Sequence, residues 1–507
     1  LVSAAFLAGL EFQHAWMPEV DAYFHIKTAW LMTHHGLFHG FPWAADSLWN
    51  DVYSDTCFLF HVYLMPFTFF SSLAFGAKLA ASLLAAAVFT SLHWILRRDG
   101  VRWAGAWTVM LALSGPYFIW RIDTPRPQVL SVLLALWSVH FLVNRRRRAF
   151  LVTCFLFPFA YAAAFLPVIF AAAVSLQRLA AYDEPDWRTP AWAAAACLAG
   201  LCFHPYFPND FLMLYVQDFY VLWMKLFGHV HLELGQELSA MDTKNLVASH
   251  APLVCAWLAL VQLAALTGRK PGERTQALAA LAFLGVGMMF VVQRFVEYAV
   301  PLLILYLAAR ADELLSQPDL ERTLRLTTER KSAAIALLVA FAALGSSAQL
   351  WAEVRAYNNT YPSTLGGAAA YLEAHAAPGE RVFTCHWGDG PQLLFYDSDQ
   401  RYMVLMDPTF MYYWSPAVWK TWRDVAEAKL GAATYPALRD VFGARYGVCG
   451  KGFEPLYNLV KADPRFEVPY EAKGTFVFRL KPMPRNARPP AHAARLTKPA
   501  HGHPRGR

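Results

Sequence analysis

Charged side chains are scarce in this sequence. Asp, Glu, Lys and Arg together make up 16% of its 507 residues, whereas 57% of the residues are hydrophobic and 15% are aromatic. An average soluble domain carries about 25% charged residues. The composition therefore excludes an ordinary soluble enzyme and favours a protein with many membrane-spanning segments.

Metal-binding cysteine patterns are also lacking. The seven cysteines show neither a CxxC pair nor the combined Cys and His spacing that is typical of zinc sites. Two of them, Cys385 and Cys449, fall in predicted buried strands. They either pair in an oxidising compartment or remain unpaired core residues. We expect no cofactor, and the sequence does not support a divalent metal.

Long apolar segments are concentrated in the first 350 residues. Residues 149–177 form a run that is long for one span and short for two, and its prolines and small residues predict a tight hairpin of two short helices. With this hairpin the sequence predicts about eleven transmembrane helices. The apolar segments lie at about 1–13, 77–96, 103–120, 128–143, 149–177, 190–204, 251–267, 275–293, 298–310 and 332–350.

Lys and Arg gather in the short loops at one end of these segments, which the positive-inside rule places in the cytoplasm. The basic loops are residues 97–102, 144–148, 268–274 and 321–331. The loops of the opposite end are long, aromatic and acid-containing, so chemistry is expected on the extracytoplasmic face. They comprise residues 14–76, about 121–127, 205–250 and the part of the chain after 350.

After residue 350 the pattern changes to short strands that alternate with helices. Strands are predicted at 381–387, 401–406 and 445–450, helices at 368–376 and 436–444, and a closing hairpin at 466–480. The predicted architecture has three parts. They are an all-α polytopic membrane domain (1–350, with a first outer loop at 14–76), a small extracytoplasmic α/β domain (351–480) and a disordered basic tail (481–507).

The stretch PEVDAYFHIKTAW, near the start of the chain, predicts a short amphipathic helix on the membrane surface. Asp21 and His25 share one face of this helix. Asp21 is either a first-turn acid stabilised by exposed amides or a catalytic carboxylate. Further acids in the same loop favour catalysis, because a carboxylate beside aromatic side chains can take a proton from a sugar hydroxyl. These acids are Asp46, Asp51 and Asp55.

Two other stretches carry arginine at the outer membrane boundary. In WRIDTPRPQVL, a predicted loop between two spans, Arg121 and Arg126 flank Asp123, and two guanidinium groups can hold a phosphate through forked hydrogen bonds. The alternative is that both arginines reach the lipid headgroups. In VVQRFVEYAVP, Arg294 and Glu297 interrupt apolar sequence, either as a mutual ion pair or as a phosphate-holding arginine with its positioning acid.

Four stretches, taken in order, resemble the GT-C superfamily of polytopic glycosyltransferases. They are DAYFHIKTAWLMTHHG, FLFHVYLMPFTFFSSLAFGAKLAASLLAAAVFTSLHWILRR, SGPYFIWRIDTPRPQVLSVLLALW and QRFVEYAVP. The superfamily includes oligosaccharyltransferase catalytic subunits, protein O-mannosyltransferases and aminoarabinose transferases. The likeness covers residues 1–180 by sequence and 180–350 by topology, and the last domain looks like the outer domain of bacterial GT-C-like proteins.

The resemblance implies an inverting glycosyltransferase of the bacterial inner membrane. It would move a sugar from a polyprenyl phosphate to a glycan, lipid or protein acceptor, with membrane lipids as further partners and no nucleic acid. Asp21 matches the first-loop catalytic acid. Relatives often follow Arg-Pro with an acid, whereas this chain has Gln128 after Arg126 and Pro127. Asp123 would therefore substitute, or the second acid is unnecessary, and a metal-binding acid pair is in doubt.

The predicted catalytic residues are Asp21 and Asp123. The predicted substrate- and phosphate-binding residues are His25, Asp55, Arg121, Arg126, Arg294 and Glu297. A second hypothesis is a catalytically inactive scaffold that binds a partner through its outer domain, because Gln128 cannot act as a base. A third is a transporter, which would be expected to show repeat symmetry and ionisable residues near the bilayer midplane. No repeat is visible.

Overall fold

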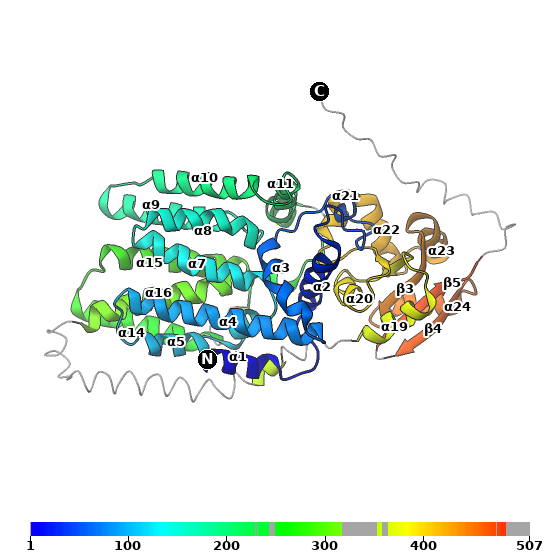
Figure 1. Ribbon diagram of the computed structural model, residues 1–507, viewed down its shortest axis with the longest axis horizontal. Helices are drawn as coiled ribbons and strands as arrows, with labels where there is room; N and C mark the ends of the chain where they lie inside the picture. Colours follow the sequence, from blue (N-terminus) through cyan, green and yellow to red (C-terminus); the bar gives the residue numbers. More distant parts are fainter. Residues whose placement is uncertain are drawn as a thin grey trace, which may run out of the picture. The chain divides into compact units, whose positions relative to one another are not determined.

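The computed structural model describes residues 2–228, 230, 232–242, 249–316, 352–356, 364–472 and 474–482. The chain divides into two compact units, and each unit is assembled from separate segments (Figure 1). The first unit comprises 1–30, 55–214 and 235–362, and the second comprises 31–54, 215–234 and 363–507. The predicted span 332–350, the basic segment 321–331 and all but the first two residues of the predicted tail lie outside the described residues.

The first unit is a bundle of apolar helices (Figure 1). Its longer helices are α1 (Val2–Glu11), α4 (Leu73–Arg98), α7 (Pro127–Val143), α8 (Arg147–Ala160), α9 (Leu166–Tyr182), α10 (Arg188–Cys202), α14 (Ala251–Thr267), α15 (Glu273–Val291) and α16 (Val296–Leu315). Large apolar side chains stay exposed on several of them, including Trp94 of α4 and Phe283 of α15. Such surfaces are expected to face lipid.

Two described helices, α4 and α15, are long and apolar enough to cross a membrane. The bent pair of α6 (Pro116–Asp123) and α7 is a third candidate, and shorter apolar helices accompany them. These helices have the length and apolar composition expected of an integral membrane protein. The number of about eleven transmembrane helices remains a prediction.

The predicted hairpin over residues 149–177 is confirmed, because α8 ends at Ala160 and α9 begins at Leu166. Pro167 lies in the first turn of α9, where its missing N–H leaves no helical bond unmade. Gly200 of α10 packs so closely on α8 that a Cβ there would collide with the carbonyl of Phe155. Small residues thus let these apolar helices approach one another.

The single span predicted at 103–120 is wrong, because the chain breaks between α5 (Ala104–Ala112) and α6. Gly115 has a φ of 142°, which favours glycine, and a Cβ there would collide with the carbonyl of Ser249. The axis then turns by 104° between α6 and α7. Arg121 and Asp123, expected in a loop, consequently lie in the last turn of a helix.

The second unit contains a five-stranded sheet in the order β2-β1-β3-β5-β4. Its strands are β1 (Arg381–Thr384), β2 (Arg401–Tyr402), β3 (Ala444–Gly450), β4 (Phe466–Ala472) and β5 (Thr475–Leu480). The first three are parallel, whereas β4 and β5 form the predicted antiparallel hairpin. The predicted strands and the α/β character of this region are confirmed, although β1 and β2 are shorter than expected.

Helices surround this sheet: α19 (Gly366–His375), α20 (Asp389–Tyr396), α21 (Thr409–Trp414), α22 (Pro416–Ala426) and α24 (Glu454–Ala462). The helix predicted at 436–444 appears as consecutive helical turns from Thr434 to Val441. A segment of the first loop also joins the sheet, because the N–H of Ala45 donates to the carbonyl of Tyr402 at 2.7 Å. Leu232, from another distant segment, lies in the hydrophobic core of the unit.

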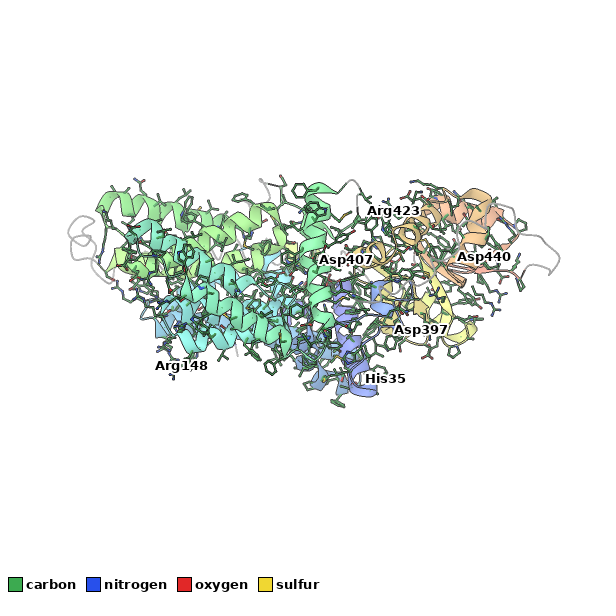
Figure 2. All side chains as sticks on the ribbon, turned by 90° about the horizontal axis from the view of Figure 1, so that it is seen from above. His35, Arg148, Asp397, Asp407, Arg423 and Asp440 are labelled. Atoms are coloured by element: carbon green, nitrogen blue, oxygen red, sulfur yellow. A yellow bond between two sulfur atoms is a disulfide. The ribbon has the colours of Figure 1, made fainter. Side chains whose placement is uncertain are left out.

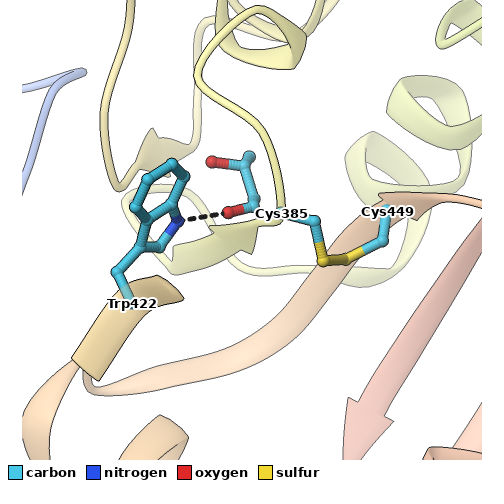
Figure 3. Close-up of a disulfide and its surroundings, with 4 residues drawn as sticks. Cys385, Trp422 and Cys449 are labelled. Carbon is cyan, nitrogen blue, oxygen red and sulfur yellow. Dashed lines mark hydrogen bonds between the residues drawn. A yellow bond between two sulfur atoms is a disulfide. The ribbon is translucent and has the colours of Figure 1, made fainter. Parts of the chain in front are cut away.

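Cys385 and Cys449 form a disulfide that links the residue after β1 to β3 (Figure 3). Beside it, the indole N–H of Trp422 donates to the carbonyl of Thr384 at 2.7 Å. Of the two alternatives for these cysteines, the structure has the bonded pair.

Replacing both bonded cysteines (Cys385→Ser with Cys449→Ser) should destabilise the second unit by about 4 kcal/mol, the loop-closure free energy for a loop of this length. The two positions are 64 residues apart. The effect is measured by unfolding the full chain in denaturant and using the protease resistance of the second unit as the readout. Exposed free cysteines, Cys202→Ser with Cys255→Ser, provide the control. Equal stability of the wild type with and without reductant would contradict the expectation.

Candidate functional site

Asp21 lies in the first turn of α2 (Val20–His35), which confirms a helix at the predicted place. The side chains from Ala22 to Ala29 are all buried, so this part of the helix does not rest on a surface as its amphipathic pattern indicated. The backbone N–H of Asp21 donates to Glu19 Oε2 at 3.0 Å. Glu19 therefore caps α2, because its side-chain oxygen satisfies a backbone N–H at the start of the helix.

Three arginines from separate elements meet beside Asp21. Arg121 lies in the last turn of α6, Arg126 immediately precedes α7, and Arg294 lies in the turn Gln293–Phe295 before α16. Arg126 Nη2 is 3.3 Å from Asp21 Oδ2. The structure thus brings together four of the residues that the sequence singled out.

One carboxylate that the sequence did not single out connects the three arginines. Glu237 Oε2 accepts from Arg121 Nη1 at 2.8 Å and from Arg126 Nη2 at 2.7 Å. Its other oxygen is 3.4 Å from Arg294 Nη1. The turn that carries Glu237 is joined to the turn of Arg294, because the N–H of Gln293 donates to the carbonyl of Ser239 at 2.9 Å.

Glu297 is paired with a different arginine from the one expected. Arg121 Nε donates to Glu297 Oε1, and both side chains are almost completely buried. Arg294 instead lies over the ring of Tyr161, with 5.6 Å between its guanidinium carbon and the ring centroid. The local ion pair between Arg294 and Glu297 that the sequence allowed is replaced by a long-range pair.

Each of the three arginines retains a buried N–H donor without a hydrogen-bond partner among the described residues. These donors are Arg121 Nη2, Arg126 Nε and Arg294 Nε. Buried donors are nearly always satisfied in proteins, and guanidinium groups prefer carboxylate or phosphate oxygens. The cluster of Arg121, Arg126 and Arg294, called the arginine cluster below, can therefore accept an anion beyond the carboxylates it already binds.

The acids around the arginine cluster differ in basicity. Burial raises the pKa of Glu237, but Arg126, Arg294 and Arg121 outweigh burial and hold that pKa well below the usual range. Burial raises the pKa of Asp21, and Arg126 only partly opposes it. Glu237 is thus a permanent anion, whereas Asp21 is a carboxylate with increased affinity for a proton.

A second chain of polar groups begins one helical turn after Asp21. His25 Nδ1 is 2.9 Å from His61 Nε2, and His61 Nδ1 is 2.6 Å from Asp55 Oδ2. A carboxylate accepts, so His61 donates through Nδ1 and accepts at Nε2, and His25 must donate through Nδ1. Burial and the neighbouring His61 hold the pKa of His25 well below its usual range. This arrangement leaves a lone pair on His25 Nε2.

Asp123 stands apart from this constellation. It is two residues from Arg121 on α6, and such residues point to different faces of a helix. Both of its carboxylate oxygens are buried without a partner among the described residues, and its electrostatic neighbour is Glu11 of α1. No contact connects Asp123 with the arginine cluster in the described part of the chain. Its predicted catalytic role therefore gains no geometric support.

The sequence missed Glu19, Glu237 and His61 as parts of the site. Glu237 falls in the outer loop 205–250, where acids were expected but no spacing marks one of them. Among the described residues, no three His, Cys, Asp or Glu side chains are grouped so that they could hold a metal ion.

Solved proteins that share this fold include the following three. The oligosaccharyltransferase of Archaeoglobus fulgidus is 11% identical with a TM-score of 0.66, over 89% of this chain and 69% of its own. ArnT from Cupriavidus metallidurans, bound to undecaprenyl phosphate, is 14% identical with a TM-score of 0.61, over 94% and 96%. The arabinofuranosyltransferase AftD from Mycobacteria is 15% identical with a TM-score of 0.55, over 96% and 41%.

No protein-family model and no curated protein matches the sequence. At 11–15% identity the structural likeness establishes the fold. The chain shares the fold of these glycosyltransferases, and the predicted resemblance is thereby confirmed at the level of the fold.

Glu19 should make stability depend on pH. Burial, reinforced by Asp21, raises the pKa of Glu19 to about 8. Between its unfolded and folded pKa values the folded protein therefore keeps a proton that the unfolded chain releases, and stability falls as the pH rises from about 4.5 to 8. Glu19→Gln should remove this loss of a few kcal/mol, because each pKa unit corresponds to about 1.4 kcal/mol.

Unfolding measured at pH 5 and pH 8 tests this expectation. Glu184→Gln is the control, because the Glu184 side chain is 72% exposed. An unchanged pH dependence in Glu19→Gln would show that Glu19 is ionised in the fold.

Proposed function

We propose that this protein is an inverting glycosyltransferase that moves a sugar from a polyprenyl phosphate to a hydroxyl of an acceptor. The observation that carries the proposal is the arginine cluster, which has buried unpartnered donors beside the proton-accepting carboxylate of Asp21. This pairing supplies both functions that the reaction needs. One group removes the acceptor proton, and the others stabilise the departing phosphate.

The donor phosphate would bind to the arginine cluster. Its oxygens would accept from the free donors Arg121 Nη2, Arg126 Nε and Arg294 Nε. Glu237 already holds the three guanidinium groups at one point without a ligand, which limits the reorganisation required during the reaction. Because Glu237 contacts other nitrogens of these arginines, the phosphate and Glu237 would use separate donors.

Asp21 would act as the general base. It takes the proton from the acceptor hydroxyl as the hydroxyl oxygen attacks the anomeric carbon. The bond between that carbon and the phosphate oxygen breaks, and the leaving polyprenyl phosphate keeps the electron pair. Attack on the face opposite the leaving group inverts the configuration. The raised pKa of Asp21 favours this proton transfer at neutral pH.

His25 and Asp55 would act through hydrogen bonds rather than by binding phosphate. His25 lies one turn from Asp21 on the same helix face, and because its lowered pKa keeps the imidazole neutral, its Nε2 lone pair would accept a hydrogen bond that orients Asp21 or the acceptor hydroxyl. Asp55 and His61 would fix its tautomer. This assignment refines the phosphate contact that the sequence suggested for both residues.

The fold neighbours support a lipid-phosphate donor. ArnT was solved with undecaprenyl phosphate, and the archaeal oligosaccharyltransferase with an inhibitory peptide and a dolichol-phosphate.

The disulfide between Cys385 and Cys449 supports an oxidising location for the second unit. With the basic loops in the cytoplasm, we place the second unit outside a bacterial inner membrane. A glycan, lipid or protein hydroxyl would be the acceptor.

Asp21→Asn should abolish transfer while leaving donor binding nearly intact, because the amide keeps the shape of the side chain but takes no proton. Transfer from radiolabelled polyprenyl-phosphate sugar to membrane acceptors measures turnover, and donor retention on the purified protein measures binding. Asp123→Asn is the matched control and should retain transfer. Transfer by Asp21→Asn at the wild-type rate would remove Asp21 from the mechanism as the general base.

Arg126→Gln should weaken donor binding by roughly 10–100-fold, the effect of losing charge-assisted hydrogen bonds to a phosphate. Isothermal titration with a short-chain polyprenyl phosphate measures the affinity. Arg102→Gln is a suitable control, because Arg102 is 45% exposed and pairs with Asp312. Equal affinity in both variants would show that the arginine cluster does not receive the phosphate.

A further inference from the structure

A second polar site lies in the helical bundle, at the end opposite the arginine cluster. A cavity of about 310 Å³ opens among the ends of α7, α8, α9 and α15 and the segment that leads into α10. These helices lie beside one another in Figure 1. The volume is at the lower end of the range of about 300–1,000 Å³ that is usual for ligand pockets.

The two sites are separated by the length of α7. Arg126 precedes the first residue of this helix, and Val143, its last residue, lines the cavity. A helix of 17 residues is roughly 25 Å long, which is close to the thickness of the hydrocarbon core of a bilayer. The arginine cluster and the cavity therefore correspond to opposite membrane faces.

Positive charge dominates the walls of the cavity. Five arginines line it: Arg145, Arg147, Arg178, Arg188 and Arg274. Only two acids, Asp186 and Glu273, accompany them. Asp186 is already engaged as a cap, because its oxygens accept from the side chain and backbone of Thr189 at 2.6 and 3.3 Å. Glu184 and Asp99 pair with Arg178 and Arg274 from outside the lining, and the five arginines still outnumber the acids beside them.

Some of these arginines have N–H groups that are not used in hydrogen bonds with described residues. Arg145 pairs with Glu273, and Arg274 pairs with Asp99. Arg178 is 3.5 Å from Glu184 and 3.8 Å from Glu273, but the buried Nε atoms of Arg178 and Arg274 have no hydrogen-bond partner among the described residues. Arg188 forms no ion pair with a described residue, and Arg147 lies 5.2 Å from the ring centroid of Trp192. Donors of this kind suit phosphate oxygens.

Besides the polar residues Ser175, Gln177 and Thr189, the remaining walls carry apolar side chains, which include Phe141, Phe150 and Val174. A small inorganic anion would use only the arginines, whereas a phospholipid would also place its glycerol and first acyl carbons against these side chains. Basic pockets between transmembrane helices at the cytoplasmic face bind anionic headgroups. We infer that this cavity holds the phosphodiester headgroup of an anionic phospholipid, in the leaflet opposite the arginine cluster.

Native mass spectrometry of the purified full-length chain tests the inference. Phosphatidylglycerol is titrated against phosphatidylcholine on the wild type, on Arg147→Gln with Arg188→Gln, and on Arg178→Gln. The control is Arg146→Gln with Arg148→Gln, which removes the same amount of charge. Both residues are exposed, flank Arg147 in the sequence and do not line the cavity. Arg148 is labelled in Figure 2. Melting temperatures verify that the variants are folded.

We expect phosphatidylglycerol to bind the wild type and the control alike, and each cavity variant roughly tenfold or more weakly. Phosphatidylcholine should bind all proteins weakly. Equal loss in the control and cavity variants would overturn the inference, because the general basic field would then explain binding. Inorganic phosphate that displaces the lipid stoichiometrically at equal concentration would also overturn it, since the site would then be one for a free anion. The experiment measures no transfer and is independent of the proposed activity.

Discussion

The burial of the Arg121 and Arg126 guanidinium groups beside the partly buried Arg294 is the constraint on which the site depends. Removing charges from water is costly, and only close counter-ions with good hydrogen bonds compensate for it. Glu237 supplies bonds to Arg121 and Arg126 and lies near Arg294, while Glu297 and Asp21 complete the balance. These pairs hold the ends of α6, α7 and α16 and the turn at Glu237 in register. They also leave buried donors that point to a further anion.

The same interactions separate the chemical roles of the acids. Glu237 is surrounded by positive charge and stays ionised, whereas burial gives Asp21 a raised pKa despite its contact with Arg126. The pKa values of two neighbouring carboxylates are thereby shifted in opposite directions. This is the usual arrangement when one carboxylate moves a proton and the other stabilises charge. His25 adds a neutral imidazole whose free nitrogen is determined by His61 and Asp55.

Several features could be predicted because they depend on local sequence. Proline and small residues within 149–177 predicted the hairpin of α8 and α9, and alternating apolar residues at 466–480 predicted the hairpin of β4 and β5. The break at Gly115 could not be predicted in the same way. It reflects contact with Ser249, a residue far along the chain, so the apolar run 103–120 looked like one continuous helix. The buried state of α2 likewise comes from tertiary packing that its amphipathic pattern does not reveal.

The sequence by itself determined the apolar helical character of the first unit, the strand pattern of the second, and the positions of Asp21, Arg121, Arg126 and Arg294 near one end of the helices. Helical and strand periodicity and the distribution of charge carry that information. Only the tertiary structure decided which acid meets which arginine. Arg121 selects Glu297 and Glu237, Asp123 turns to a different face of α6, and Cys385 bonds to Cys449. Such pairings join residues that are distant in the chain, and local patterns do not specify them.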